Sequence, residues 1–417
     1  MLPWLGWPVL LGIGVAATLL RDGDAAVRGV IWAEDGRIFL TDAYRHGLGA
    51  LLAPYNGYGH VLDRCLAAVI VAVVPLSAQG IAINVTAALG QVLLAVLARA
   101  VVASHTRSRW PGWVAFAYIV LVPVGPETPA SIANLQWVLL CVAPLAACWL
   151  PRGRGGQIGS AVAVAAFVGS SPFGAIAVVV AGLGWLVTRS RFHVALVVIA
   201  AVGALTQAVV ILGAPAREVS HRIDLTALLS GYARRVVGDG FLGLPSPADA
   251  STADQLWRVV LPVLLILALL IVVVRSDRRG LWLPLGLIVL SVGIYAVPTT
   301  LGGTLVDNPY ADARYFVAPA VLLVCAVLIL ADMALGNARG WLRQVGRGAT
   351  VVVVAALVWA LAVSYDAPRN WRRDGWTWAE QLGPARAQCA KQAEAEVQVP
   401  IWPPPWVAFV PCDRLVE

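Results

Sequence analysis

Residues Trp32 to Arg64 read WAEDGRIFLTDAYRHGLGALLAPYNGYGHVLDR and carry two adjacent acids, Glu34 and Asp35, directly after the first apolar segment. The chain around them is 59% hydrophobic and only 13% charged, with a mean hydropathy of +0.79. Soluble proteins are about 25% charged. The composition therefore predicts a polytopic membrane protein, in which acids beside a span are costly and usually functional.

Apolar runs long enough to cross a bilayer recur along the chain. They predict an all-α polytopic fold with about 11 transmembrane helices, at 4–20, 80–103, 111–124, 135–150, 157–170, 173–188, 193–213, 256–274, 281–298, 314–332 and 349–364. A further run, 61–74, is shorter and stops at Pro75. We interpret 37–51 and 60–75 as juxtamembrane helices on the outer membrane surface.

The basic residues gather in short loops, as they do on the cytoplasmic side of membrane proteins. If 61–74 were another crossing, the loops that carry Arg107 and Arg152 would lie on the same side of the membrane as the acid-rich segments. Without it, the N-terminus and every arginine cluster are cytoplasmic, and 21–79 is the first outer loop. All but one of the 30 basic residues are arginines, which is typical of a high-GC bacterium. We therefore expect a multi-pass protein of the bacterial plasma membrane. The arginines form no stripe that would bind nucleic acid.

Residues 365–417 are predicted to form a small α+β extracytoplasmic cap after a transmembrane domain over 1–364. Asp374 can cap a helix, and VQVPIW and WVAFVPC alternate as short strands do. Cys389 and Cys412 lie in this polar tail. Outside the cytoplasm they should form a disulfide.

This arrangement resembles the GT-C-fold glycosyltransferases of bacteria, polytopic enzymes that take a sugar from a polyprenyl-phosphate carrier. The resemblance lies in the acidic pair after the first span, the surface helices before the second, the many further spans and the soluble outer tail. It implies a GT-C-like fold, a polyprenyl-phosphate-linked sugar as donor, and a glycan or glycolipid of the cell envelope as acceptor. Membrane lipid is the third expected partner. No cofactor is certain, and a divalent metal stays open.

In that superfamily a carboxylate of the first outer loop acts as the base, which corresponds here to Glu34 or Asp35. A carboxylate in a partly dry site can take a proton from an acceptor hydroxyl, and a raised pKa suits it to this role near neutral pH. The alternative is that the pair only caps the surface helix beginning near Gly36, since acids favour helix N-termini. The predicted reaction is an inverting sugar transfer.

A second acid, Glu127, lies in the segment VGPETPASIANLQW between two predicted spans. In several GT-C enzymes an acid in this neighbourhood joins the first-loop acid in the site. Side chains that could hydrogen-bond or stack on a sugar ring follow it, namely Asn134, Gln136 and Trp137. The alternative is a solvated loop in which Trp137 belongs to the interfacial aromatic belt.

The end of the first loop, PYNGYGH, offers Tyr55 and Tyr58 as further acceptor-binding side chains. His60 could assist proton transfer or bind a metal. A single histidine beside tyrosines is more often a structural hydrogen-bonding residue. No Cys and His cluster with zinc spacing occurs in the sequence, so the metal ligands are unknown at this stage.

A lipid-phosphate donor needs fixed cations, and the planar fork of arginine suits phosphate oxygens. Arg314 lies in DARYF at the start of the span predicted at 314–332, followed by Tyr315, and similar segments occur in related membrane glycosyltransferases. The alternative for Arg314 is an ion pair with Asp312 or Asp307. Other candidates for binding the donor phosphate are Arg234, Arg235, His221 and Arg222.

The alternative function is a transporter or flippase of a lipid-linked or anionic solute, with the same acids and arginines as a gate. Such transporters tend to have repeated halves and charges near the membrane midplane. Here no repeat is visible, and the charges lie at the edges of the apolar runs. The sequence also lacks the G-x-x-x-x-G-K and G-x-S-x-G motifs, which disfavours a nucleotide-driven pump and a serine hydrolase.

Overall fold

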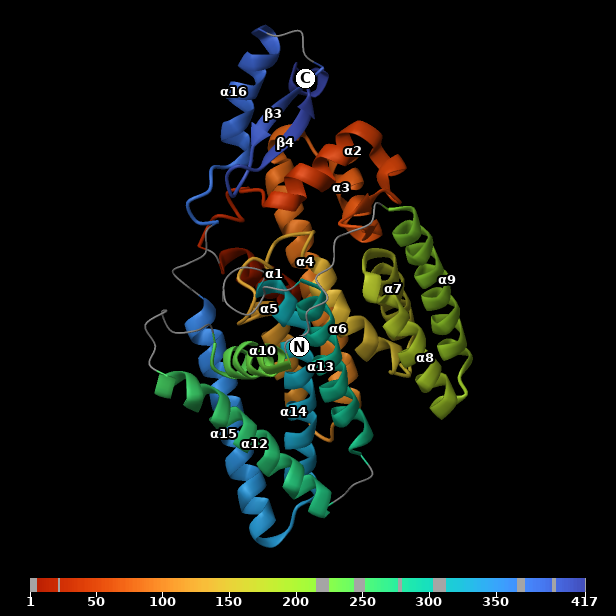
Figure 1. Ribbon diagram of the computed structural model, residues 1–417, viewed down its shortest axis with the longest axis vertical. Coiled ribbons are helices and arrows are strands. Elements are labelled where there is room, and N and C mark those ends of the chain that lie inside the picture. The colour runs from red at the N-terminus through yellow and green to blue at the C-terminus, as the bar shows by residue number, and fades with distance from the viewer. Residues whose placement is uncertain are drawn as a thin grey trace. The chain divides into compact units, whose positions relative to one another are not determined.

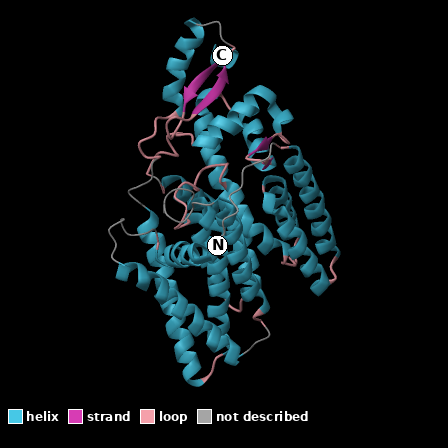
Figure 2. Cartoon of the chain, in the orientation of Figure 1, coloured by secondary structure: helices cyan, strands magenta, loops and turns pink. Residues whose placement is uncertain are grey.

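The computed structural model describes residues 6–21, 23–214, 225–243, 252–276, 280–302, 313–365, 372–391 and 395–416. Most of this part of the chain is helical, and two antiparallel sheets of two strands each occur in it (Figures 1 and 2).

Each predicted transmembrane segment contains a helix. The helices are α1 (Gly6–Leu20), α4 (Gln79–Ser104), α5 (Trp110–Leu121), α6 (Leu135–Ala147), α7 (Arg154–Ser170), α8 (Ala175–Thr188), α9 (Arg191–Gly213), α12 (Thr252–Ser276), α13 (Trp282–Gly302), α14 (Val317–Asn337) and α15 (Gly340–Tyr365). Prediction and structure agree because long uninterrupted apolar runs leave the backbone no better partners than its own hydrogen bonds.

In the described part of the chain, 5 helical stretches are long and apolar enough to cross a membrane, as a helical membrane protein requires. They are Leu76–Ser104, Arg191–Gly213, Leu256–Ser276, Ala313–Asn337 and Gly340–Tyr365. Shorter apolar helices are Gly6–Leu20, Trp110–Leu121, Leu135–Ala147, Pro172–Thr188 and Trp282–Val297. The larger number of crossings and the GT-C-like arrangement stay predictions.

The first loop, residues 21–79, folds into short elements. They are η1 (Asp35–Leu40, a π-helical turn), α2 (Thr41–His46), η2 (Gly47–Ala50), β1 (Pro54–Tyr55), β2 (Tyr58–Gly59), α3 (Val61–Val73) and η3 (Leu76–Ala78). Helices therefore form where surface helices were predicted. Between them lies a hairpin, whose turn residues Asn56 and Gly57 have φ of 52° and 84°. Positive φ at both positions is typical of an Asn-Gly hairpin turn.

Contacts within the chain divide it into two compact units. Unit 1 consists of Met1–Leu94, Thr128–Arg217 and Pro368–Glu417, and unit 2 of Ala95–Glu127 and Glu218–Ala367. The C-terminal tail thus belongs to the same unit as the first loop. Each unit is described separately below.

The tail contains α16 (Trp378–Lys391), the paired strands β3 (Glu396–Pro400) and β4 (Val407–Pro411), and α17 (Cys412–Val416). The N-terminal cap of α16 is Thr377 and not the predicted Asp374. Thr377 Oγ1 accepts a hydrogen bond from the amide of Glu380, and Glu380 Oε2 accepts one from the amide of Thr377. This reciprocal pair is a capping box. The predicted disulfide between Cys389 and Cys412 is present, with Cα atoms 5.6 Å apart.

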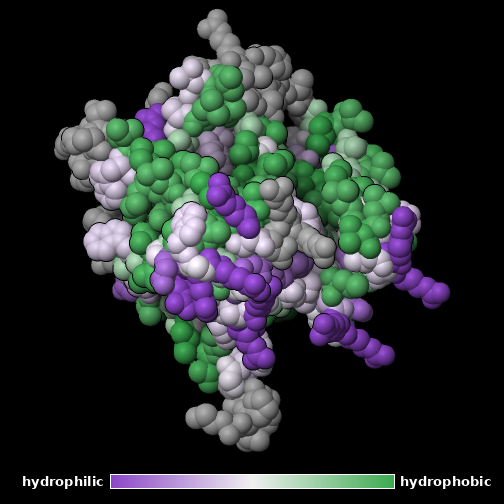
Figure 3. All heavy atoms as spheres, turned by 90° about the horizontal axis from the view of Figure 1, so that it is seen from below, coloured by the Kyte–Doolittle hydropathy of each residue, from purple (hydrophilic) through white to green (hydrophobic). Residues whose placement is uncertain are grey.

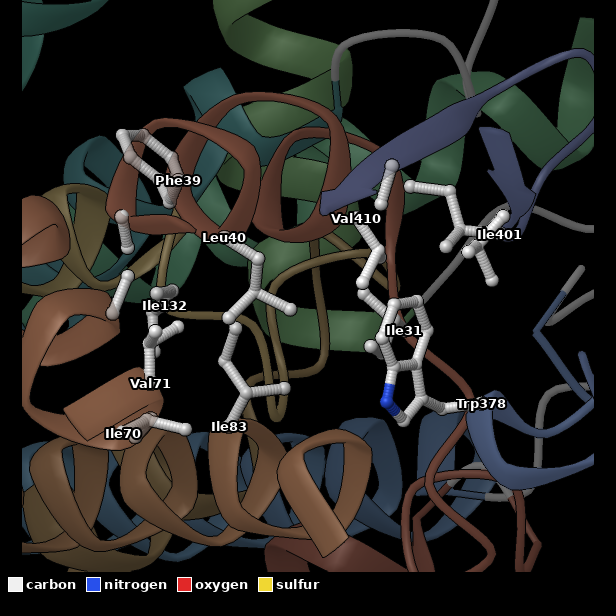
Figure 4. Packing of buried hydrophobic residues seen from close by; sticks show 14 of the residues in the cluster. Ile31, Phe39, Leu40, Ile70, Val71, Ile83, Ile132, Trp378, Ile401 and Val410 are labelled. Atoms are coloured by element: carbon white, nitrogen blue, oxygen red, sulfur yellow. The ribbon is translucent and has the colours of Figure 1, made fainter. Parts of the chain in front are cut away.

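The hydrophobic core of unit 1 joins the tail to the first loop (Figure 4). Its buried side chains come from the first loop, including α3, and from α4, the 128–134 segment and the tail. Among them are Ile31, Phe39, Leu40, Ile70, Val71, Ile83, Ile132, Trp378, Ile401 and Val410. The backbone adds two hydrogen bonds, from Trp402 N to Ile31 O (3.1 Å) and from Ala33 N to Trp402 O (2.7 Å). The tail therefore directly supports the residues that precede Glu34.

Unit 2 is built around α14. In the most apolar 18-residue stretch of each helical segment, 94% is buried for the one that contains α14, against 22% for α12 and 33% for α15. The reason is that α5, α12, α13 and α15 all pack on α14. Smaller elements complete the unit, namely α10 (Leu225–Gly231), η5 (Tyr232–Gly238, a π-helical turn), α11 (Asp239–Leu242) and η6 (Ala313–Phe316). Figure 3 shows hydrophobic side chains covering broad areas of one face of the molecule around a group of hydrophilic ones.

Asp332, near the end of α14, accepts hydrogen bonds from the backbone amides of Arg107 (2.6 Å) and Ser108 (3.2 Å). The arginine-rich loop at 105–109 is therefore attached to the C-terminal end of α14. Arg314 lies just before the N-terminal end of the same helix. A helix of 21 residues is about 30 Å long, so Arg314 is about a membrane thickness from that loop.

Candidate functional site

Asp35 is the more deeply buried acid of the adjacent pair, with 0% of its surface exposed against 8% for Glu34. Its Oδ1 atom accepts a hydrogen bond from the amide of Ala133 (2.9 Å) and another from the hydroxyl of Ser131 (3.2 Å). Within the described residues, Oδ2 has no hydrogen-bond partner. One carboxylate oxygen is thus held in place while the other is left for a further contact.

Burial raises the pKa of Asp35 from 3.8 to about 7, because an ionised carboxylate loses its hydration inside the protein. The hydrogen bond from Ala133, the positive charge of Arg372 and the Ser131 hydroxyl lower the pKa, while the neighbouring Glu34 raises it. Asp35 can therefore accept or release a proton near neutral pH.

Glu34 lies at the N-cap position of η1 and is 8% exposed. Its side chain makes no capping hydrogen bond to this element, which the structure describes completely. Oδ1 of Asp35 is bonded to the 128–134 segment instead of to the helix that follows it. Capping hydrogen bonds thus do not account for the acid pair.

The residues that bond Asp35 are themselves supported by predicted site residues. Asn134 Nδ2 donates to the Ser131 hydroxyl (3.1 Å), and Gln136 Nε2 donates to the carbonyl of Ala133 (3.1 Å). The Tyr58 hydroxyl donates to Gln136 Oε1 (3.1 Å). The structure therefore brings three of the predicted side chains into one hydrogen-bonded group around the site of Asp35.

His60 lies in an aromatic environment next to this group. Its ring is 5.5 Å from those of Phe39 and Tyr55 and 4.3 Å from that of Tyr58, measured between centroids. Nδ1 of His60 is 3.0 Å from Oδ2 of Asp63, and burial raises the pKa of this second acid. Trp137 is also buried, at 6% exposed. Among the described residues, no group of three or more His, Cys, Asp or Glu side chains could hold a metal ion.

Sequence reasoning missed two contributors to the site, Ser131 and Arg372. Arg372 is 2% exposed and donates to the carbonyls of Val30 and Ala130, so it joins the two segments that meet at Asp35. The available signals were an arginine pair in the polar segment after the last apolar run and a serine between two predicted site residues.

In unit 2 the structure pairs Arg314 with Glu127. Arg314 N donates to Glu127 Oε1 (3.3 Å), and Arg314 Nη1 is 3.8 Å from Glu127 Oε2. The guanidinium carbon of Arg314 lies 5.7 Å from the ring centroid of Tyr315. Glu127, which was predicted to join the first-loop acid in the site, thus contacts Arg314, the predicted phosphate-binding arginine. Asp307 and Asp312, the alternative partners of Arg314, lie outside the described residues, as do His221 and Arg222.

A second charged cluster in unit 2 centres on Asp239. Its carboxylate lies 3.4 Å from Nη1 of Arg235 and 3.5 Å from Nη2 of Arg258. Burial raises the pKa of Asp239 to about 6, and the two arginines act in the opposite direction. Arg234 is more exposed, and its Nε donates to the carbonyl of Ser230 (3.3 Å). Arg258 was not predicted from the sequence.

Comparisons with protein families, with curated proteins and with solved structures found no match to this chain.

Proposed function

We propose that the protein is a membrane glycosyltransferase that moves a sugar from a polyprenyl-phosphate donor to a glycan or glycolipid acceptor of the cell envelope, outside the cytoplasm. The observation that carries the proposal is Asp35, a buried carboxylate with one oxygen fixed and the other without a hydrogen-bond partner among the described residues. The resemblance of the sequence to GT-C enzymes supports the same reaction. Asp35, rather than Glu34, is the proposed base, because its fixed oxygen and near-neutral pKa suit proton transfer.

In the proposed reaction, Oδ2 of Asp35 accepts the proton of the acceptor hydroxyl. The acceptor oxygen then forms a bond to the anomeric carbon on the face opposite the phosphate. The bond between that carbon and the phosphate oxygen breaks, and the lipid phosphate leaves with the electron pair. One displacement inverts the anomeric configuration. Oδ2 is buried, so acceptor binding must displace a neighbouring side chain.

The lipid phosphate needs cations to stabilise its charge as it leaves. From the sequence, the candidates for this role are Arg314, Arg234 and Arg235. The guanidinium of Arg314 is part of a side chain that is 20% exposed, so a ligand can reach it. Among the described residues, the Asp239 carboxylate has two arginines within 3.5 Å, Arg235 and Arg258. Guanidinium groups of this kind suit the oxygens of a bound phosphate.

The decisive experiment is a transfer assay with purified protein, radiolabelled polyprenyl-phosphate sugars and an acceptor extract. We expect Asp35→Asn to lower the rate by about 10²- to 10⁴-fold, the usual contribution of a general base. The matched control is Asp24→Asn, which changes an exposed acid of the same loop and should leave the rate unchanged. The Glu34→Gln variant tests the neighbouring acid.

The pH dependence gives a second readout. Because the base must be ionised, the wild-type rate should be low below pH 7 and rise with pH through the pKa of Asp35, about 7. A wild-type protein that transfers no sugar from any donor refutes the proposed function. Full activity of Asp35→Asn refutes the assigned base. Movement of a labelled lipid across vesicle membranes without sugar transfer would instead support a flippase.

A further inference from the structure

Arg372 donates hydrogen bonds to three backbone carbonyls, which belong to two segments near Asp35. Its Nη2 and Nε atoms both donate to the carbonyl of Val30, at 2.7 and 3.2 Å. Nη1 donates to the carbonyls of Ala130 (3.0 Å) and Pro129 (3.3 Å). Because Arg372 comes from the C-terminal tail, three segments distant in sequence meet at one guanidinium.

Asn84 on α4 fixes the orientation of this guanidinium. Its Oδ1 accepts from Nη2 of Arg372 at 2.5 Å, and its Nδ2 donates to the carbonyls of Ala26 (2.8 Å) and Val30 (3.1 Å). Both side chains are buried, at 0% for Asn84 and 2% for Arg372. The rigid fork of arginine is suited to bridging several acceptors, whereas the single ammonium of lysine is not.

The segments that Arg372 joins are those that position Asp35. Val30 lies four residues before Glu34, and Ala130 directly precedes Ser131, whose hydroxyl donates to Asp35. The charged groups that act on Asp35 are Arg372, which favours its ionised form, and Glu34, which opposes it. Arg372 is thus placed to affect both the geometry and the charge of the acid.

We propose that Arg372 is a positioning residue for Asp35, which holds the 26–35 and 128–134 segments together and brings a positive charge to the site of the acid. The role of that acid as a base rests on the proposed function. The two measurements below report on the contact itself and need no sugar transfer, so their failure is distinct from a failure of the transfer assay.

The first measurement is an infrared titration of the full-length protein in detergent between pH 5 and 9. The band of the protonated Asp35 carboxyl is identified by its loss in Asp35→Asn. We expect Arg372→Gln to move the midpoint of this band upward by about one pH unit, because a nearby cation is removed. Arg373→Gln, which changes the adjacent arginine, should leave the midpoint in place. An unchanged midpoint in folded Arg372→Gln overturns the proposed effect on charge.

The second measurement uses Arg372→Lys, which keeps the charge and loses the fork, and it decides the case if Arg372→Gln does not fold. Hydrogen exchange should become at least tenfold faster for amides of the 128–134 segment, including that of Ala133, and stay unchanged in α9 of the same unit. Exchange equal to wild type in the 128–134 segment overturns the proposed positioning role. Arg373→Lys is the matched control and should exchange as the wild type does.

Discussion

Asp35 in unit 1 and Asp239 in unit 2 are both buried, at 0% and 7% exposed, but different groups contact them. Asp239 has guanidinium groups of two arginines within 3.5 Å, whereas Oδ1 of Asp35 is bonded by a backbone amide and a hydroxyl. Burial raises the pKa of Asp35 to about 7 and that of Asp239 to about 6. Close counter-charges thus offset part of the cost of burying an acid.

The difference separates two uses of a buried carboxylate. An acid between two arginines is an ion-pair centre, and removing a partner leaves a charge without compensation. An acid held by neutral donors keeps its proton near neutral pH and can exchange it with a ligand. The four predictions below test this contrast, beginning with the largest effect.

Replacing Asp35 by Asn should stabilise the protein at pH 8. The rise in pKa from 3.8 to about 7 corresponds to about 4 kcal/mol of folding free energy lost once Asp35 is ionised in the native state. The wild-type protein keeps this part of its unfolding free energy below about pH 4, where Asp35 is protonated in both the folded and the unfolded state. It loses that part as the pH rises through about 7. Unfolding in detergent at several pH values should show the variant's advantage at pH 8 shrinking towards pH 5. Equal pH dependence in both proteins would contradict the assigned pKa.

Replacing Arg258 by Met should destabilise the protein by about 3 kcal/mol at pH 8, because Asp239 then keeps one close cation, Arg235, among the described residues. The loss should diminish below pH 6, where Asp239 takes up a proton. The same unfolding measurement on Arg234→Met, which changes an exposed arginine, serves as the control and should differ little from wild type. A variant as stable as wild type would mean that Asp239 is not an ion-pair centre.

Replacing Ser131 by Ala removes one of the donors to Asp35 and should cost about 1 kcal/mol. It should also raise the pKa of Asp35 further, since the hydroxyl favours the ionised form. The unfolding free energy and the infrared midpoint of the Asp35 carboxyl measure the two effects. A lowered midpoint would mean that the hydroxyl does not donate to the carboxylate.

The smallest effect is expected at the exposed ion pair between Arg45 and Glu396, whose side chains are 38% and 33% exposed. Replacing Glu396 by Gln should change stability by less than about 0.5 kcal/mol, because solvent and salt screen the pair. Unfolding in low and high salt is the measurement. A loss of stability comparable to that of Arg258→Met would show that solvent exposure does not weaken this ion pair relative to the buried one at Asp239.

Much of the secondary structure could be predicted from local patterns. Uninterrupted apolar runs predicted the long helices, and alternation predicted β3 and β4. The hairpin turn at Asn56 and Gly57 was missed although its residue pair is a turn signal. The length of an apolar run did not predict how much of the helix is buried. α14 and α12 are both long and apolar, yet 94% and 22% of their most apolar 18-residue stretches are buried.

The sequence by itself determined the helical membrane character of the chain, the acid pair and the tail cysteines, because apolar length, charge and side-chain chemistry are properties of neighbouring residues. Only the tertiary structure decided that Asp35 is the more enclosed acid of the pair, that Glu127 contacts Arg314, and that Arg372 joins the segments around the site. The amide of Ala133 and the guanidinium of Arg372 come from distant parts of the chain. Desolvation and charge pairing depend on these distant contacts, and a local pattern does not contain them.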